Sequence, residues 1–286
     1  MSRNKGEKPG ISKTTSQKRK GEEGFEGYFS ALFGERWSGL REALLGRTSY
    51  ATLASPLLEP YYLDRASLLP ARALPVVEAG QIVDLCAAPG GKALDLAVRM
   101  GANSRLLVNE RSRNRLARLR RVLDDHLPRE IRERVEIFGH DGALWGSKRP
   151  GAADAVLCDV PCSSEAHLLA SQAHLAQWSF SRIRRLAGQA VGLLASAFDS
   201  LTPGGVVVYS TCALSQEEND HVVARVLDRR GAQARLYRPG PGELREIAEG
   251  VLAPELIEET ELGYQILPDR SGGSGPIYFT RLRKEG

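Results

Sequence analysis

The chain has 286 residues, of which 42% are hydrophobic and 26% charged, and its formal net charge is +4. This length suits one large α/β domain with a smaller appended segment, and no run approaches the roughly 20 apolar residues of a membrane span. We therefore expect neither a membrane protein nor, since no apolar run opens the chain, a secreted one. The four cysteines form no small-domain framework, so we expect free thiols and a cytoplasmic location.

The first residues of the chain are strongly basic. Residues 1–20 contain one acidic side chain, Glu7, and several basic ones: Arg3, Lys5, Lys8, Lys13, Lys18, Arg19 and Lys20. So few apolar residues cannot form a core, and the composition predicts a disordered basic tail over residues 1–24. Two interpretations stay open, a solvated terminus and a contact with the phosphate backbone of a nucleic acid.

The following segment, residues 25–75, is predicted to be helical and to precede the main domain. Its first part has apolar side chains mostly at i, i+3 and i+4 spacing: Phe25, Phe29, Leu32, Phe33, Trp37, Leu40 and Leu44. Gly34 interrupts this pattern, which predicts two short helices rather than one.

Between residues 76 and 286, strands and helices alternate, which predicts an α/β domain with a doubly wound, mostly parallel, Rossmann-like sheet. We expect strands at 82–86, 104–109, 135–139, 154–159 and 206–211. We expect helices at 92–100, 112–126, 181–201 and 216–230, and a Thr-Pro-Gly-Gly turn at 202–205. Two β-like runs at 263–267 and 276–282 predict an antiparallel hairpin at the carboxyl end.

A glycine-rich turn joins the first strand of this domain to its first helix: Cys86, Ala87, Ala88, Pro89, Gly90, Gly91 and Lys92. The turn matches neither the phosphate-binding P-loop nor the Gly-x-Gly-x-x-Gly pattern of dinucleotide sites. Two acidic residues, Glu110 and Asp141, follow the next two strands, and an acid after the second strand binds ribose hydroxyls in such folds. An ordinary tight turn explains the glycines alone. Together with the two acids, the turn favours a nucleoside without pyrophosphate, S-adenosylmethionine.

Two further turns place thiols at the ends of predicted strands, where an open parallel sheet has its ligand crevice. Cys162 lies three residues after Asp159, and Cys212 precedes a capping-box pattern at 215–218. A thiolate that adds to carbon 6 of a pyrimidine activates carbon 5, and a helix amino terminus helps to lower the pKa of the thiol. A carboxylate such as Asp159 can hold a proton on the ring during the addition. These residues predict covalent chemistry on a base.

The other cysteines, Cys86 and Cys158, are interpreted as small buried hydrophobic residues. Zinc binding is the alternative for the spacing of Cys158 and Cys162. The five histidines form no ligand pairs around these cysteines, so we expect no metal site.

In this order, the motifs resemble the NOP/Sun family of RNA (cytosine-5) methyltransferases from about residue 61 to residue 282. The resemblance is carried by Asp-Leu-Cys-Ala-Ala-Pro-Gly-Gly-Lys at 84–92, Asp-Val-Pro-Cys-Ser at 159–163, Pro-Gly-Gly at 203–205, Ser-Thr-Cys-Ala-Leu-Ser-x-x-Glu-Asn at 210–219 and Gly-Pro-Ile-Tyr-Phe at 275–279. It implies a class I S-adenosylmethionine-dependent methyltransferase fold. It also implies cofactor contacts at the turn 86–92 and at Glu110, Arg115, Asp141, Gly142 and Asp159.

The resemblance further implies that Cys212 is the nucleophile and that Cys162 helps to release the methylated product. Lys92 and Asp159 then line the chemistry. Residues 25–45 look most like the short, organelle-type branch of the family, which lacks an appended RNA-binding domain. The implied partner is RNA, with rRNA preferred and tRNA second. We also consider a protein that presents the RNA, and we expect a monomer.

Some features leave the RNA site unassigned. Ser164 and Glu165 stand where the family often has glycine, and Ala93 replaces a frequent Ser or Thr. The predicted helix 112–126 is rich in arginine, which indicates either a solvated face or a contact with RNA phosphates. Its arginines are Arg113, Arg115, Arg118, Arg120 and Arg121.

Two rival functions are also considered. A catalytically silent RNA-binding or assembly factor would keep the fold, but the set Cys212, Cys162, Asp159 and Lys92 is complete, which favours an enzyme. A DNA methyltransferase would use the Pro-Cys thiol as its nucleophile and would leave the Thr-Cys at 211–212 unexplained.

Overall fold

The computed structural model describes residues 20–286. The predicted basic tail lies outside these residues except at its end, where helix α1 (Gly21–Phe33) begins at Gly21. Residues 21–24 are therefore helical and do not belong to a tail. The helix is held in place because Phe25 and Phe29 are fully buried.

Within residues 20–286, nine strands form one mixed sheet in the order β5-β4-β3-β6-β7-β11-β10-β9, with β8 paired to β11. The strands with parallel neighbours are β3 (Gln81–Asp84), β4 (Arg105–Asn109), β5 (Val135–Phe138), β6 (Ala153–Asp159) and β7 (Leu201–Thr211). The antiparallel strands are β8 (Ala234–Leu236), β9 (Glu258–Glu259), β10 (Tyr264–Ile266) and β11 (Ile277–Lys284). The doubly wound sheet and its antiparallel C-terminal hairpin are confirmed.

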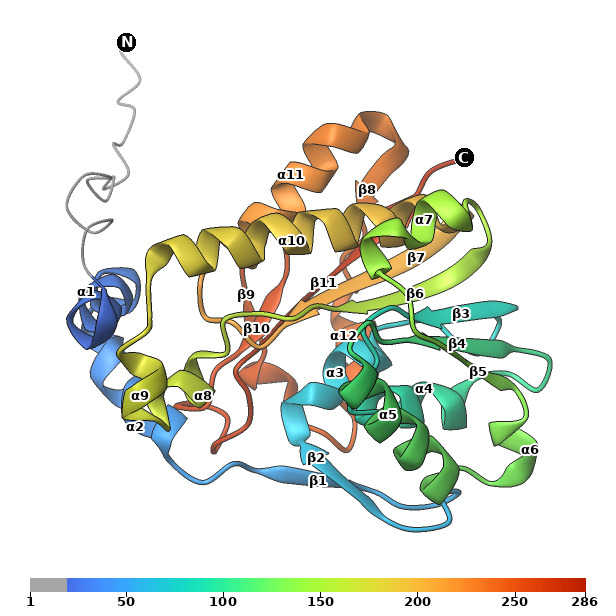
Figure 1. The fold of residues 1–286 in the computed structure, drawn as a ribbon, viewed down its shortest axis with the longest axis horizontal. Coiled ribbons are helices and arrows are strands. Elements are labelled where there is room, and N and C mark those ends of the chain that lie inside the picture. Colours follow the sequence, from blue (N-terminus) through green and yellow to red (C-terminus); the bar gives the residue numbers. More distant parts are fainter. Residues whose placement is uncertain (1–19) are drawn as a thin grey trace.

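Helices cover both faces of the sheet (Figure 1). One face packs against α7 (Trp145–Lys148), α10 (Phe180–Asp199) and α11 (Asp220–Arg230). The other packs against α3 (Leu68–Arg72), α4 (Gly91–Arg99), α5 (Arg113–His126) and α12 (Pro241–Ala248). Since the central strands are buried on both faces, their sequences are continuous apolar runs, which made them easy to predict.

Short helices complete the chain. They are α2 (Trp37–Leu45), α6 (Arg129–Arg132), α8 (Glu165–Leu169) and α9 (Gln172–Leu175). Single 3-10 turns lie at η2 (Gly34–Arg36), η3 (Arg65–Ser67), η4 (Gly142–Leu144), η5 (Gly231–Gln233) and η6 (Pro254–Leu256). The two short helices that we predicted around Gly34 are confirmed as α1 and α2.

Several predicted boundaries are wrong. Strand β7 begins at Leu201, so the predicted turn at 202–205 lies inside a strand with a register shift opposite β6. Helix α11 begins at Asp220, not at residue 216. The segment 25–75 is not helical throughout, because β1 (Tyr50–Leu53) and β2 (Tyr61–Asp64) form an antiparallel hairpin within it.

The N-terminal helices pack on α8 and α9 through an aromatic cluster. Phe25, Phe29 and Trp37 lie against Trp178, with the Phe29 and Trp37 rings stacked 5.2 Å apart. Leu214, two residues after Cys212, belongs to the same buried cluster. The N-terminal helices therefore support the loop that carries Cys212.

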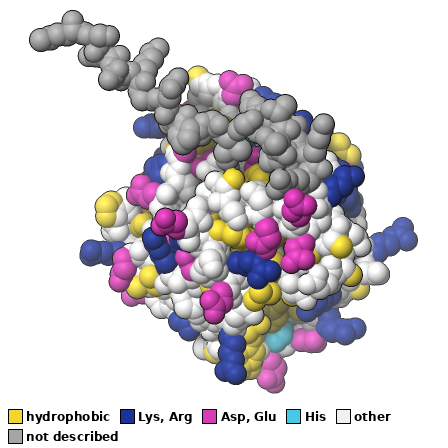
Figure 2. All heavy atoms as spheres, turned by 90° about the vertical axis from the view of Figure 1, so that its left-hand side faces the viewer, with side chains coloured by type: hydrophobic (Ala, Val, Ile, Leu, Met, Phe, Trp, Pro, Cys, Tyr) yellow, Lys and Arg dark blue, Asp and Glu magenta, His cyan; other side chains and the backbone are white. Residues whose placement is uncertain are grey.

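The surface around these helices is mixed in charge. Figure 2 shows this end of the molecule, where acidic and basic side chains are interspersed and no large area carries a single sign. In the part of the chain that the structure describes, no helix has the length and apolar character needed to cross a membrane.

Candidate active site

The carboxyl ends of β3 and β6 meet in one crevice, as expected for an open parallel sheet. Its cavity has a volume of about 120 Å³ and is lined by Tyr61, Leu63, Ser67, Asp84, Cys86, Ala87, Ala88, Pro89, Gly91, Lys92 and Asp159. The structure thus brings most of the glycine-rich turn together with Lys92 and Asp159. Sequence reasoning missed Tyr61, Leu63 and Ser67, which come from the unpredicted hairpin and the turn after it.

Glycine is required at two positions of the turn. Gly90 has a φ of +126°, which L side chains rarely adopt, and a Cβ there would lie 2.8 Å from Cγ1 of Val122. A Cβ on Gly91 would lie 2.8 Å from the ring of Tyr61. The turn is therefore packed between α5 and β2, and its backbone itself forms a wall of the cavity.

Lys92 and Asp159 form an ion pair at the edge of the cavity. Lys92 Nζ donates to Asp159 Oδ2 at 2.7 Å, and Ser210 Oγ donates to Asp159 Oδ1 at 2.6 Å. Burial alone would lower the pKa of Lys92, but Asp159 and the nearby Cys212 raise it above its usual value. Lys92 is therefore charged, and it holds the Asp159 carboxylate in place.

Asp84, at the end of β3, lines the cavity and is a buried carboxyl group with a raised pKa. Its side chain is 1% exposed, and within residues 20–286 neither carboxylate oxygen has a hydrogen bond of good geometry, although the backbone N–H of Cys86 lies close enough to lower its pKa. Burial, and then the Asp159 carboxylate, raise the pKa of Asp84 to about 7. A buried carboxyl group without a partner is costly, so Asp84 is suited to receive a donor from a ligand.

The four cysteines are free thiols. Cys158 is fully buried, as predicted, but Cys86 lines the cavity and is not simply a core residue. Burial and the carboxylates of Asp84 and Asp159 raise the pKa of Cys86, so this thiol is protonated. Among residues 20–286, no three His, Cys, Asp or Glu side chains are gathered in a way that could hold a metal ion.

The remaining predicted cofactor residues lie outside the cavity lining. Glu110 is buried, accepts from the Ser112 N–H at 2.7 Å and pairs with Arg115 at 3.2 Å. Arg115 also donates to the carbonyl of Ala88 at 2.6 Å and so braces the glycine-rich turn. Asp141 is exposed and accepts from the N–H of Ala143, which begins a 3-10 turn at Gly142.

The two candidate catalytic thiols are adjacent. Cys162 Sγ and Cys212 Sγ lie 2.9 Å apart. The hydrogen bond from Cys162 lowers the pKa of Cys212, whereas burial and the carboxylates of Asp159 and Glu165 oppose this effect. The same hydrogen bond, together with burial, raises the pKa of Cys162. Of the two thiols, Cys212 therefore loses its proton first.

A buried acid network, which sequence reasoning missed, joins the two thiol loops. Ser163 Oγ lies 2.6 Å from Glu218 Oε2 and is also hydrogen-bonded to Glu165, so its single proton serves one of these two carboxyl groups. Glu165 Oε2 accepts from the N–H of Leu214 at 2.9 Å. Burial and Glu218 raise the pKa of Glu165 to about 7. The loop after Cys162 is thereby tied to the loop after Cys212.

This network also explains why the predicted capping box is wrong. Ser215 Oγ donates to the Glu218 side chain at 2.8 Å instead of capping a helix, and α11 begins only at Asp220. Glu218 is occupied by Ser163, across 55 positions of sequence. The hydrogen bond from Cys162, followed by one from Ser164, lowers the pKa of Cys212, and no helix begins directly beside this thiol.

Comparison with known proteins identifies the family. Residues 71–282 match the family model of the 16S rRNA methyltransferase RsmB/F. The chain belongs to this family. Residues 84–92, 159–163 and 210–219, which form the crevice and the thiol loops, all lie within the matched RsmB/F region.

Three relatives of this RsmB/F chain are informative. The 5-cytosine rRNA methyltransferase NSUN4 of Xenopus laevis is 36% identical over 235 residues, which are 79% of this chain and 56% of the relative. The mitochondrial tRNA (cytosine(34)-C(5))-methyltransferase of Danio rerio is 35% identical over 237 residues, 80% of this chain and 61% of the relative. The chain thus spans somewhat more than half the length of these relatives.

The third is a solved structure, NSun6 from Pyrococcus horikoshii with SFG, which superposes with a TM-score of 0.61 at 24% identity. The superposition covers 79% of this chain and 53% of that one. With the mixed sheet described above, this likeness shows that the fold is that of the class I methyltransferases.

Proposed function

We propose that this chain is an S-adenosylmethionine-dependent RNA (cytosine-5) methyltransferase that works through a covalent cysteine–base adduct. The observation that carries the proposal is the thiol pair, in which Cys212 has a lowered pKa and a protonated neighbour 2.9 Å away. Cys212 also lies close enough to Lys92 to raise its pKa, which places the pair beside the Lys92–Asp159 ion pair. A nucleophile activated by its neighbours, with a fixed carboxylate beside it, is what addition to a pyrimidine requires.

The cavity residues fit S-adenosylmethionine. The ligand carries a sulfonium and an ammonium group, and the cavity is lined by the carboxyl groups of Asp84 and Asp159, which favour positive charge. An ammonium group would supply the donor that buried Asp84 lacks. Glu110 and Asp141, beyond the cavity, would hold the ribose. The relative NSun6 was solved with SFG, an analogue of this cofactor.

In the proposed mechanism, the Cys212 thiolate attacks carbon 6 of the cytosine and forms a sulfur–carbon bond, which moves an electron pair to carbon 5. Asp159, held by Lys92 and Ser210, accepts a hydrogen bond from the base edge and holds the proton taken up by the ring nitrogen. The cofactor supplies the methyl group that carbon 5 receives.

Release reverses the addition. Carbon 5 gives its proton to water, and the electron pair of that bond restores the double bond between carbons 5 and 6. The sulfur–carbon bond breaks, its electron pair returns to Cys212, and the ring nitrogen gives its proton back to Asp159. Cys162 then donates a hydrogen bond to the departing thiolate, which lowers the free energy of the leaving group. We assign this task to Cys162 because its pKa is raised and its sulfur lies 2.9 Å from the Cys212 sulfur.

The preferred substrate is rRNA and the second choice tRNA, in line with the names of the NSUN4 and mitochondrial relatives. We further propose a cytoplasmic monomer, with a separate protein to present the RNA as a second possible partner. A catalytically silent RNA-binding factor is less well supported, because it would have no use for two adjacent thiols with opposite pKa shifts.

The test compares alanine variants of the two thiols. Cys212→Ala should be inactive and should form no covalent RNA adduct, because the attacking sulfur is gone. Cys162→Ala should still attack but should accumulate a protein–RNA conjugate that survives denaturing electrophoresis, because release is impaired. Cys158→Ala, which removes a fully buried thiol that does not line the cavity, serves as the control and should form no conjugate.

Trapping of the conjugate in Cys212→Ala would instead assign the attack to Cys162, as in the DNA methyltransferases. Absence of a conjugate in both variants, with intact binding of S-adenosylmethionine, would favour the silent RNA-binding factor. Bisulfite sequencing of RNA from a deletion strain would identify the target cytosine.

A further inference from the structure

A cleft lies between α10 and α11, outside the site described above. It has a volume of about 290 Å³ and is lined by Ser181, Arg184, Ala187, Glu217, His221 and Arg225. The positions 181, 184 and 187 share one face of α10, and 217, 221 and 225 form a stripe that runs into α11. One wall of the cleft is therefore a face of α10, and the other is the stripe of residues that leads into α11.

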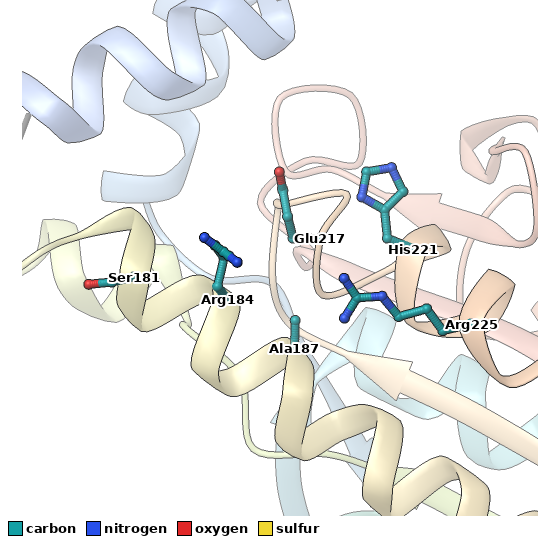
Figure 3. A pocket seen from close by; sticks show the side chains of 6 residues that line it. All are labelled: Ser181, Arg184, Ala187, Glu217, His221 and Arg225. Carbon is teal, nitrogen blue, oxygen red and sulfur yellow. The ribbon is translucent and has the colours of Figure 1, made fainter. Parts of the chain in front are cut away.

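Two arginines line this cleft, one from each helix. Figure 3 shows the Arg184 side chain reaching in from α10 and the Arg225 guanidinium reaching in from α11, with Ala187 between them. Because Ala187 ends at Cβ, it leaves the space between the arginines open. Within residues 20–286, neither Arg184 nor Arg225 has an ion pair or a side-chain hydrogen bond. By contrast, Arg230 on the same helix α11 is paired with Asp199 at 2.6 Å.

The one acidic residue among the described residues that line the cleft, Glu217, already has a hydrogen-bond partner. Glu217 accepts a hydrogen bond from the Tyr28 hydroxyl, which ties this side chain to helix α1. The cleft therefore contains one carboxylate, which has a hydrogen-bond partner, and two guanidinium groups, which have no ion-pair partner among the described residues. The cleft has a positive balance, whereas the charges at the neighbouring end of the molecule are interspersed (Figure 2).

The cleft is connected to the thiol loops through a single residue. Glu218, next to Glu217, accepts from the backbone N–H of Ser163 at 2.8 Å and from its hydroxyl at 2.6 Å. Ser163 directly follows Cys162, and the segment 213–219 runs from Cys212 to the cleft. The cleft and the two thiol loops are therefore linked in the fold by this buried contact and by the segment 213–219.

We propose that the cleft binds a backbone phosphate of the RNA next to the target nucleotide, with Arg184 and Arg225 holding the phosphate from two sides. This assignment rests on the proposed function, since it takes RNA as the substrate. Arginine suits the task because its planar guanidinium can donate two hydrogen bonds to one phosphate group. Two arginines on separate helices also fix the position of the strand, whereas an exposed arginine on a single helix does not.

The test uses the full chain and a fluorescent 20-nucleotide single-stranded RNA that contains cytosine, with affinity measured at several salt concentrations. The double variant Arg184→Gln with Arg225→Gln should bind this RNA roughly tenfold more weakly at 0.1 M salt, because the contact with this phosphate is lost. The slope of log affinity against log salt should fall by about 0.7, the value for one phosphate of a single strand. Arg185→Gln with Arg229→Gln, exposed arginines of the same helices outside the cleft, is the matched control and should change the slope less.

Equal slopes in the cleft and control variants would overturn the phosphate assignment, even if the wild type binds RNA. Weaker RNA binding accompanied by weaker S-adenosylmethionine binding would also overturn it, because the cleft variants would then act through the crevice. A wild type that binds no RNA would overturn the proposed function itself, and this site with it. The conjugate formed by Cys162→Ala is an independent readout of the proposed function.

Discussion

Replacement of Asp84 by asparagine should make the ligand-free protein more stable at pH 8 while it weakens cofactor binding. Asp84 is 1% exposed and has no hydrogen bond of good geometry among the described residues. Burial, followed by Asp159, raises its pKa from the usual 3.8 to about 7. The fold therefore prefers the neutral acid, and asparagine has nearly the same shape without the charge.

The magnitude follows from this shift. Each pKa unit corresponds to about 1.36 kcal/mol, so ionised Asp84 lowers the free energy of unfolding by roughly 4 kcal/mol at pH 8. A carboxyl group with a higher pKa in the folded state costs stability as the pH rises. This loss of stability begins near pH 3.8 and is complete above about pH 7. Less than half of it is present at pH 5, so the wild type should lose roughly 2–3 kcal/mol through Asp84 between pH 5 and pH 8.

Urea unfolding at pH 5, 6.5 and 8 measures this difference. The advantage of Asp84→Asn over the wild type should grow by the same 2–3 kcal/mol across this range. Asp95→Asn is the control: Asp95 is 2% exposed but pairs with Arg99 at 2.8 Å, so its replacement should destabilise the protein at both extremes. If the stability of Asp84→Asn and of the wild type varied with pH in parallel, the reasoning would be refuted. Calorimetry should show weaker S-adenosylmethionine binding to Asp84→Asn.

Two further predictions concern stability and are measured by the same unfolding assay. Gly90→Ala should lower the free energy of unfolding by about 2 kcal/mol, because φ is +126° and the added Cβ would contact Val122. The control Gly188→Ala, in open space on α10, should raise it by about 0.5–1 kcal/mol. Equal effects of the two substitutions would contradict the account of the turn. Arg36→Ala should cost about 1–3 kcal/mol, because Arg36 bridges the partly buried carboxylates of Glu258 and Asp269 at 2.6 Å. A loss below 0.5 kcal/mol would show that this bridge contributes no more than an exposed surface pair.

The sequence predicted the parts of the fold that are determined locally. The central strands are apolar on both faces, and Gly90 and Gly91 occupy positions where backbone strain or close packing excludes a side chain. These features can be read from a few adjacent residues, so the sheet, the glycine-rich turn and the thiol pair could be predicted. The meeting of Cys162 with Cys212 followed from the topology of parallel strands.

What could not be predicted depends on contacts between distant residues. Ser215 and Glu218 have the spacing of a capping box, but Glu218 bonds to Ser163, and this contact overrides the local preference. The hairpin β1–β2 is short and half exposed, with Tyr50 and Tyr62 largely in solvent. Its sequence therefore lacks the strong alternation that marks a buried strand. Arg184 and Arg225 lie 41 positions apart, and only the packing of α10 on α11 brings them together.

The position of the N-terminal helices has a consequence for how the protein is made. Phe25, Phe29 and Trp37 are buried by partners far along the chain, and Arg36 meets Asp269 across 233 positions. At translation rates of about 5–20 residues per second, these aromatic side chains leave the ribosome roughly 10–50 s before their last partners. Throughout that interval α1 and α2 expose an apolar surface that the finished protein hides. The support for the Cys212 loop is therefore complete only after residue 267, the last member of this cluster, has been synthesised.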